Sequence, residues 1–151
     1  MRSPRPVALL LLVLLLSACD GLSVDEGGPQ TPNTCVIKAD EPHLSSTARR
    51  RGYDSMIVKD WFICSTALQD GTLELEVQRR IGDDWELFSA RPPQTFEPVP
   101  VRIRKESVHE VSCAEGTFRT RTRLSTHDQD GTPRESQWFF SRLRTDPCGA
   151  S

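Results

Sequence analysis

The feature that most constrains the fold is an alternation of apolar and polar residues in short segments that turn residues separate. In the segment 72–80 the apolar residues Leu73, Leu75 and Val77 alternate with the polar residues Glu74, Glu76 and Gln78. A period of two places such side chains on one face of a strand. After Cys35, no window of helical length carries apolar residues at spacings of three and four. The sequence therefore predicts an all-β fold.

Strand candidates recur along the chain after this point. In order they are 35–39, 55–65, 72–80, 85–90, 101–106, 116–125 and 135–144. Turn residues at 69–71 and 82–84 flank the third candidate. Four prolines between Arg91 and Pro100 indicate a crossing loop or the edge of a sheet. About seven antiparallel strands with turns every 8–12 residues or so predict a β-sandwich.

The first 18 residues are typical of an export signal rather than of a folded domain. Arg2 and Arg5 precede an apolar run at 7–16, which is too short for a bilayer-spanning helix of about 20 residues and fits a secretory signal peptide. The run ends in LSAC at 16–19, which resembles the lipobox of bacterial lipoproteins. This resemblance implies cleavage before Cys19 and a lipid on its thiol. A plain signal peptide cut nearby is the alternative.

The lipobox resemblance implies a domain that is tethered to a membrane. Residues 19–34 are polar and contain Gly and Pro, so they bury too little apolar surface to fold and are expected to form a tether. Residues 35–148 are then the β-sandwich domain, and 149–151 are a short tail. The expected location is the outer face of the cytoplasmic membrane, or its periplasmic face in a two-membrane bacterium. The membrane is an expected partner through the lipid.

The charge balance argues against a nucleic-acid partner. Two of the 19 Lys and Arg residues precede Cys19, so the exported part has 17 basic residues against 21 acidic residues. General nucleic-acid binders are strongly basic instead. We therefore expect no nucleic acid among the partners of this chain.

The sequence also lacks the common catalytic and cofactor motifs. HExxH, GxSxG, P-loop and dinucleotide-binding glycine patterns are all missing. Residues 126–137 align with a calcium-binding loop, but Thr126 and Gln137 replace the acidic residues that supply its first and last ligands. We therefore expect no enzyme activity, no cofactor and no metal.

Three stretches resemble small exported immunoglobulin-like domains of high-GC bacteria. They are WFICSTALQDGTLELEVQRRIGDDWELFS, CAEGTFRTRTRLS and QWFFSRL. In such domains a strand that ends in Cys leads to an alternating strand and then to a hairpin with a Gly turn and a Trp. The resemblance spans residues 35–148 and implies an immunoglobulin-like sandwich, in a group many of whose members have no assigned activity.

The odd number of cysteines follows if Cys19 carries the lipid. Four of the five cysteines then remain, in an oxidising compartment that favours disulfides, and four allow three pairings. Asp130-Gly131 predicts a two-residue hairpin turn. The ladder that continues from this turn places Cys113 opposite Cys148, within disulfide reach. The predicted disulfides are Cys35–Cys64 and Cys113–Cys148.

The same hairpin register predicts two different faces. The core side would carry Phe118, Thr120, Thr122 and Leu124, opposed by Gln137, Phe139, Ser141 and Leu143. The outer side would carry Arg119, Arg121 and Arg123, opposed by Trp138, Phe140 and Arg142. Arg123 is expected beside Trp138, and Arg121 beside Phe140.

Two interpretations of this outer side stay open. In the first, the arginine stems cover outward aromatic rings while Glu74 and Glu76 balance the charge. In the second, the face is a platform for a glycan, an anionic envelope polymer or a partner protein. A second basic stretch, ARRRGYD at 48–54, is expected to be a solvated loop, with contact to anionic lipid headgroups as the alternative.

Two classes of function follow. The leading hypothesis is a non-enzymatic, lipid-anchored, immunoglobulin-like module that acts in binding at the cell surface. The alternative is a small lipoprotein inhibitor of a secreted hydrolase, a lysozyme or a protease, that inserts the loop 91–100 into the enzyme. The four prolines stiffen this loop, and rigid loops lose less entropy on binding.

Overall fold

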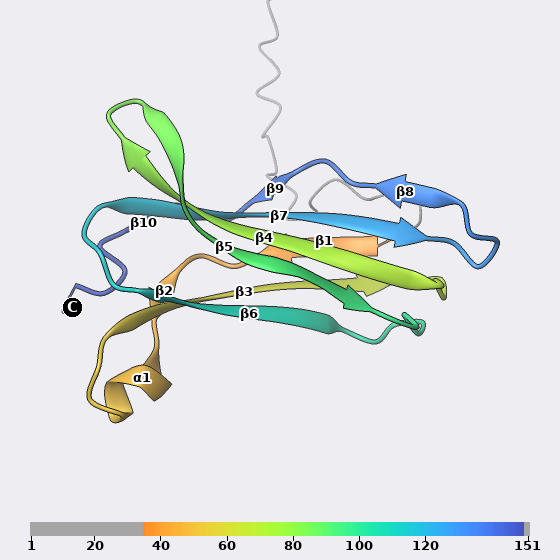
Figure 1. Cartoon of the computed structure of the whole chain (residues 1–151), viewed down its shortest axis with the longest axis horizontal. Coiled ribbons are helices and arrows are strands. Elements are labelled where there is room, and N and C mark those ends of the chain that lie inside the picture. Colours follow the sequence, from red (N-terminus) through yellow and green to blue (C-terminus); the bar gives the residue numbers. More distant parts are fainter. Residues whose placement is uncertain (1–34, 150–151) are drawn as a thin grey trace, which may run out of the picture.

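A computed structural model describes residues 35–149 and shows two antiparallel sheets packed face to face (Figure 1). The longer strands are β1 (Cys35–Ala39), β3 (Ser55–Cys64), β4 (Asp70–Ile81), β5 (Asp84–Phe96), β6 (Lys105–Ser112) and β7 (Thr117–His127). The short elements are β2 (His43–Leu44), α1 (Ser46–Arg50), β8 (Pro133–Glu135), β9 (Phe139–Phe140) and β10 (Arg144–Thr145). The predicted all-β, immunoglobulin-like sandwich is confirmed.

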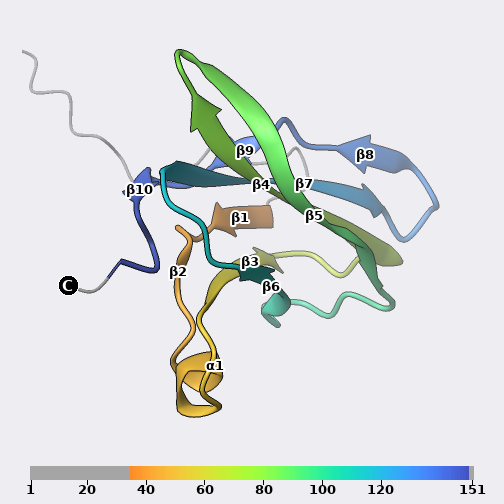
Figure 2. The ribbon, with the colours of Figure 1, turned by 60° about the vertical axis from the view of Figure 1, so that its left-hand side comes forward.

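Each sheet is built around one long strand. In the first sheet, β3 pairs with β6 along one edge and with β1 and then β2 along the other. In the second sheet, β7 pairs with β4 along one edge and with β8, β9 and β10 along the other, and β5 borders β4. Figure 2 shows the far end of the β4–β5 hairpin projecting beyond the two sheets. In a constant-type immunoglobulin domain, the sheet that contains the first strand has four strands and the other has three. Here the sheet around β3 is three strands wide and the sheet around β7 is four strands wide, because β5 pairs with β4 of the second sheet.

A polar layer divides the interior into two hydrophobic clusters. One cluster contains Cys35, Ile37, Phe62, Cys64, Leu68, Leu73, Val99, Leu124 and Phe139. The other contains Met56, Val58, Leu75, Val77, Val111 and Phe118. Between them lie the buried side chains of Asp60 on β3 and of Thr120 and Thr122 on β7. Both clusters are formed by residues between Cys35 and Cys148.

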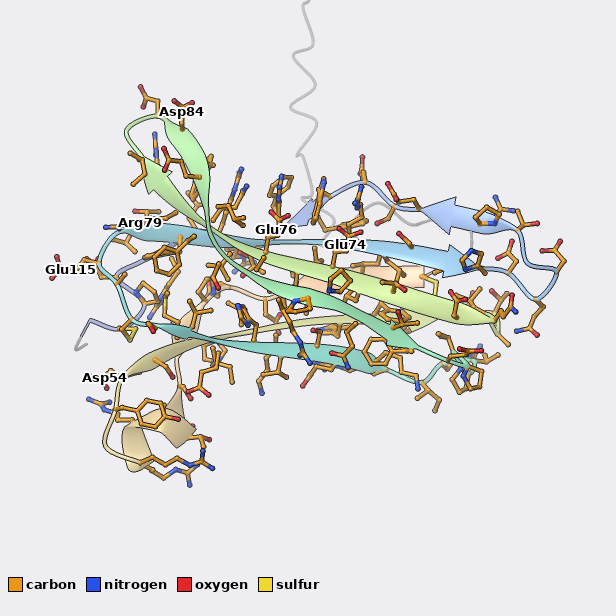
Figure 3. All side chains as sticks on the ribbon, in the orientation of Figure 1. Asp54, Glu74, Glu76, Arg79, Asp84 and Glu115 are labelled. Carbon is orange, nitrogen blue, oxygen red and sulfur yellow. A yellow bond between two sulfur atoms is a disulfide. The ribbon has the colours of Figure 1, made fainter. Side chains whose placement is uncertain are left out.

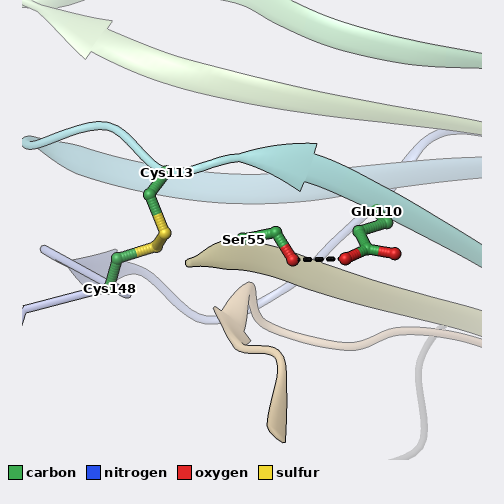
Figure 4. Close-up of a disulfide and its surroundings, with 4 residues drawn as sticks. All are labelled: Ser55, Glu110, Cys113 and Cys148. Carbon is green, nitrogen blue, oxygen red and sulfur yellow. Dashed lines mark hydrogen bonds between the residues drawn. A yellow bond between two sulfur atoms is a disulfide. The ribbon is translucent and has the colours of Figure 1, made fainter. Parts of the chain in front are cut away.

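The two disulfides join the pairs that the sequence predicts. Cys35 and Cys64 are directly opposed on β1 and β3, with Cα atoms 4.0 Å apart, and both side chains are buried. Cys113, just after β6, is bonded to Cys148 near the C-terminal end, with Cα atoms 5.8 Å apart. Figure 4 shows this second disulfide at the end of the sandwich where Ser55 Oγ donates a hydrogen bond to Glu110 Oε1. The bonds therefore secure both the first strand and the last segment.

The β7–β8 turn differs from the expected one. It has three residues between Asp128 and Thr132 rather than two, and the Asp128 N–H donates to the Thr132 carbonyl over 3.0 Å. Gly131 has a φ of 83°, which glycine adopts without steric cost. Three-residue hairpin loops commonly end in such a left-handed glycine. The pairing of β7 with β8 therefore starts one residue out of the predicted register, with His127 opposite Pro133.

The last segment is also not the continuous strand that was predicted. It is broken into β8, β9 and β10, and these breaks return Phe140 to its predicted place opposite Arg121. Phe139 faces the core as expected, whereas Gln137 and Leu143 are exposed, so their predicted inward orientation is wrong. Each break lets the chain change register without distorting β7.

Residues 91–96, where the prolines indicate a crossing loop or the edge of a sheet, belong to β5, the edge strand of the second sheet, which ends at Phe96. Two further segments differ from the sequence prediction. The segment 48–54, predicted as a loop, begins inside helix α1, where the Ser45 hydroxyl accepts a bond from the Ala48 N–H. Five residues are too few for a helical apolar stripe, so no periodicity marked this helix. The strand expected at 101–106 starts only at Lys105, as β6, because residues 101–102 form a turn and 103–104 belong to no strand.

Candidate functional site

The arginines of β7 lie on the outer face of the second sheet. They alternate with Phe118, Thr120, Thr122 and Leu124, which are buried as predicted. On β4 their cross-strand neighbours are Glu74 for Arg123, Glu76 for Arg121 and Gln78 for Arg119. Figure 3 shows Glu74 and Glu76 on the side of this sheet that faces away from β3 and β6. The predicted balance of arginines by Glu74 and Glu76 is therefore present.

Three aromatic rings alternate with these guanidinium groups. The Arg119 Cζ lies 4.2 Å from the ring centroid of Trp85 and 4.3 Å from that of Phe140. The ring of Trp138 lies 4.4 Å from the Cζ of Arg121 and 4.8 Å from the Cζ of Arg123. Cation–π contacts at such distances are worth about 0.5–1 kcal/mol each when exposed. We call these six residues, Trp85, Arg119, Arg121, Arg123, Trp138 and Phe140, the arginine–aromatic ladder.

Ion pairs hold two of the ladder arginines firmly. Arg121 Nη2 lies 2.6 Å from Glu76 Oε2. Arg123 Nη2 contacts both oxygens of Glu74 at 2.9 and 3.0 Å, and its Nη1 contacts Glu135 Oε1 at 2.8 Å. The hydrogen bond and charge of Glu74 raise the pKa of Arg123, with a smaller contribution from Glu135. These side chains are therefore oriented before any ligand arrives.

A β-bulge brings Trp85 onto the ladder. The pairing of β4 with β5 shifts between Val77–Ser89 and Gln78–Leu87, so Phe88 is an extra residue on β5. Phe88 turns inward and packs edge-on against Phe118, at 5.1 Å between centroids. Beyond it the alternation is reversed, and Leu87 and Trp85 face outward. A bulge commonly re-aims side chains at a sheet edge in this way.

The structure changes the membership of the predicted surface. Phe140 contacts Arg119 rather than Arg121, while Trp138 contacts Arg123 as predicted and Arg121 as well. Trp85 joins the ladder although the sequence did not point to it. Arg142 lies elsewhere, in a separate hollow of about 370 Å³ whose other lining residues are Lys38, Ala39, Asp40, Glu41 and His43.

The three histidines have separate partners. His127 Nδ1 lies 2.9 Å from Asp70 Oδ1, and His43 Nδ1 lies 3.1 Å from the Glu41 carbonyl. His109 Nε2 lies 2.8 Å from Ser89 Oγ, and within residues 35–149 no carboxylate bonds to the His109 ring. This contact links β6 to β5, the facing edges of the two sheets. Burial and the charge of Arg91 lower the pKa of His109, which favours the neutral ring there.

In the part of the chain that the structure describes, His, Cys, Asp and Glu side chains do not gather in threes as a metal site requires. No helix among residues 35–149 has the length and apolar character needed to cross a membrane. Cys19 and the tether at 19–34 lie outside the described residues, so their predicted roles stay predictions.

Comparisons with known proteins add little about function. No protein-family model matches the chain, and no curated protein matches it. Among solved structures, a Bordetella pertussis chain assigned as ApaA is similar over 74% of this chain and 95% of its own length. The sequence identity is 12% and the TM-score is 0.36. A likeness this weak carries no argument about what this chain does, so the case for function depends on the ladder itself.

Proposed function

We propose that this chain is an exported, lipid-anchored, non-enzymatic module that binds a partner in the cell envelope through the arginine–aromatic ladder. The observation that carries the proposal is the combination of exposed apolar surface and fixed arginines on one sheet face. Phe140 is 50% exposed, and Leu87, which is paired with Gln78 at the margin of the ladder, is 60% exposed. Tryptophan and arginine are also the residue types that most often dominate binding energy at interfaces.

Rigidity of the face supports this role. A side chain that is already held in place loses less entropy when a partner binds. Trp138 is packed by two guanidinium groups, and each of those guanidinium groups is fixed by a carboxylate of β4. The ladder therefore presents one defined surface.

Phe140→Ala is expected to weaken capture of isolated envelope material by the immobilised domain about fivefold or more, which is the usual effect of truncating a ring at a binding surface. Because Phe140 is half exposed, its loss costs the fold little. Val108→Ala is the matched control, since Val108 is 38% exposed and lies on β6 in the other sheet. Equal capture by wild type and Phe140→Ala, or an equal loss in both variants, would contradict the proposed use of this face.

Cys19→Ser is expected to release the protein from the membrane fraction and to abolish incorporation of labelled palmitate. The reason is that serine lacks the thiol that the lipobox resemblance assigns to lipid. Fractionation and metabolic labelling of cells that produce the full chain measure both effects. Unchanged palmitate labelling of the variant would show that the anchor is elsewhere.

Inhibition of a secreted hydrolase is the second candidate function. Because residues 91–96 are part of β5, the loop that would enter the enzyme is 97–104. In this turn Val101 is 46% exposed and Ile103 is 50% exposed, on either side of Arg102. The turn is held at both ends, because Val99 pairs with Leu68 and the Arg102 N–H donates to the Cys64 carbonyl over 2.8 Å. Incubation of the domain with secreted lysozymes and proteases tests this candidate, and undiminished hydrolysis in every case removes it.

A further inference from the structure

The three arginines of the ladder differ in how their charge is balanced. Arg121 and Arg123 each have a carboxylate partner on β4. Arg119 faces Gln78 instead, and its Nε–H donates to the neutral Gln78 Oε1 over 2.9 Å. Burial and the positive charge of Arg121 lower the pKa of Arg119, in contrast to the raised pKa of Arg123. Among residues 35–149, Arg119 is thus the one ladder arginine that has no carboxylate partner.

The geometry around Arg119 leaves one side of its guanidinium open. The Arg119 Cζ lies over the rings of Trp85 and Phe140, 4.2 and 4.3 Å from their centroids, and the Nε–H is bonded to Gln78. Among residues 35–149, no acceptor bonds to its two Nη groups, and neither group is a buried atom without a partner. The remaining edge can donate two parallel hydrogen bonds in the plane of the group. This is the arrangement that a carboxylate matches.

We infer that Arg119 is the anchor for a carboxylate of a protein partner, an Asp or Glu side chain or a chain terminus, which lies against the apolar surface of Phe140 and Leu87. This inference rests on the proposed binding function and names the partner of that face. One uncompensated charge suits one carboxylate. A guanidinium already covers one face of each ladder ring, which leaves less ring surface for stacking on sugars. Exposed Leu87 on β5 and Phe140 on β9 lie on opposite sides of Arg119 and fit apolar side chains that flank the acid.

Gln78→Glu tests this inference without removing any ladder residue. A glutamate at 78 repeats the Glu74–Arg123 and Glu76–Arg121 pairs and supplies Arg119 with its own carboxylate. We expect the fold to keep its melting temperature or to gain a little, because the change adds an ion pair on an intact scaffold. We expect the new carboxylate to balance the charge of Arg119, so that the guanidinium attracts an external carboxylate less strongly.

The readout is an NMR titration of the Arg119 Nε–H resonance in the exported chain, residues 19–151. The probe is acetyl-Leu-Glu-Leu-amide, and its glutamine counterpart is the neutral control. We expect the glutamate peptide to shift this resonance in a saturable way, and the glutamine peptide to bind about tenfold more weakly, as befits a lost charge-assisted hydrogen bond. Gln78→Glu should lower the affinity for the glutamate peptide by a similar factor.

Lys59→Gln is the matched control variant, since it removes a positive charge from β3 on the outer face of the other sheet. It should bind the glutamate peptide as the wild type does. Equal binding of the two peptides, or undiminished binding by Gln78→Glu, would overturn the inference. A shift of the Arg119 resonance by polygalacturonate at a lower carboxylate concentration than the peptide requires would overturn the choice of a protein partner.

The inference and the proposed function can fail separately. If Phe140→Ala lowers envelope capture while Gln78→Glu leaves it unchanged, the face binds its partner without Arg119, and only the inference is overturned. If Phe140→Ala leaves capture unchanged, the proposed function itself is wrong.

Discussion

Mild reduction of the native domain is expected to open the Cys113–Cys148 disulfide and to leave Cys35–Cys64 intact. Thiol–disulfide exchange requires an attacking thiolate to reach a sulfur. Cys35 and Cys64 have no exposed surface, whereas Cys113 and Cys148 are partly exposed. Cys113 and Cys148 are 35 residues apart in sequence, so loss of the loop constraint is expected to lower the free energy of unfolding by about 3–4 kcal/mol.

Alkylation after graded treatment with dithiothreitol, followed by peptide mass spectrometry, measures which bond opens first. The melting temperature of the singly reduced domain should fall by roughly 10–20 °C. A Cys113→Ala/Cys148→Ala variant should show the same melting temperature before and after mild reduction. Opening of both bonds at the same reductant concentration would contradict the expected protection of Cys35–Cys64.

Asp60→Asn is expected to stabilise the domain at neutral pH by about 1–3 kcal/mol, the usual cost of an unsatisfied buried polar group. Asp60 is fully buried, and neither of its carboxylate oxygens has a hydrogen-bond donor among the described residues. Burial raises the pKa of Asp60 well above its ordinary value, and contacts with the Thr122 side chain and the Asp40 backbone offset only part of this rise. The Thr122 hydroxyl donates its proton to the Glu74 carbonyl over 2.8 Å. It can therefore accept a bond from an amide or a protonated carboxyl, but it has no second proton for a carboxylate.

The pH dependence gives the sharper test. Native Asp60 keeps its proton at a higher pH than the unfolded chain, where the carboxyl titrates near pH 4 or so. Its contribution to stability is therefore complete below about pH 4 and is lost as the pH rises through the raised native pKa. Asparagine does not titrate, so the advantage of the variant should be smallest near pH 4 and should grow toward pH 8.

Chemical unfolding of wild type and Asp60→Asn across this range measures the effect. His109 acts in the opposite direction, because its lowered pKa reduces stability below about pH 6.5. This contribution is common to both proteins and cancels in their difference. A difference in unfolding free energy that stays constant from pH 4 to pH 8 would show that Asp60 is not the titrating group.

The strands that the sequence predicted well are those with one face in the core. β1 and β7 alternate throughout, β3 and β4 alternate over most of their length, and burial of every second residue enforces their register. β5 and β6 were harder to predict because they lie at sheet edges, where prolines, polar residues and bulges replace alternation. The three-residue turn after β7 was missed since an Asp-Gly pair fits a two-residue turn as well. Helix α1 leaves no periodic signal at five residues.

The candidate site was predictable only in part, for a related reason. The arginines of β7 and their acidic neighbours on β4 lie on regular strands, so their common face could be read from alternation alone. Trp85 could not, because uninterrupted alternation places it on the same side as Ser89, toward the interior. The bulge at Phe88 reverses this orientation, and bulge positions depend on how neighbouring strands pack. The Gln at 78, between two glutamates and two arginines, is the signal that could have singled out Arg119.

If the ladder is the binding face, the tryptophans of the chain report on it directly. There are three of them: Trp85 and Trp138 belong to the ladder, and Trp61 lies on the other sheet with Arg104 over its ring at 4.7 Å. Labelling with fluorotryptophan gives each residue its own ¹⁹F resonance. On addition of solubilised envelope material, binding at the ladder is expected to shift or broaden the Trp85 and Trp138 signals and to leave the Trp61 signal unchanged. Broadening of Trp61 alone, or no change in any of the three signals, would contradict binding at this face.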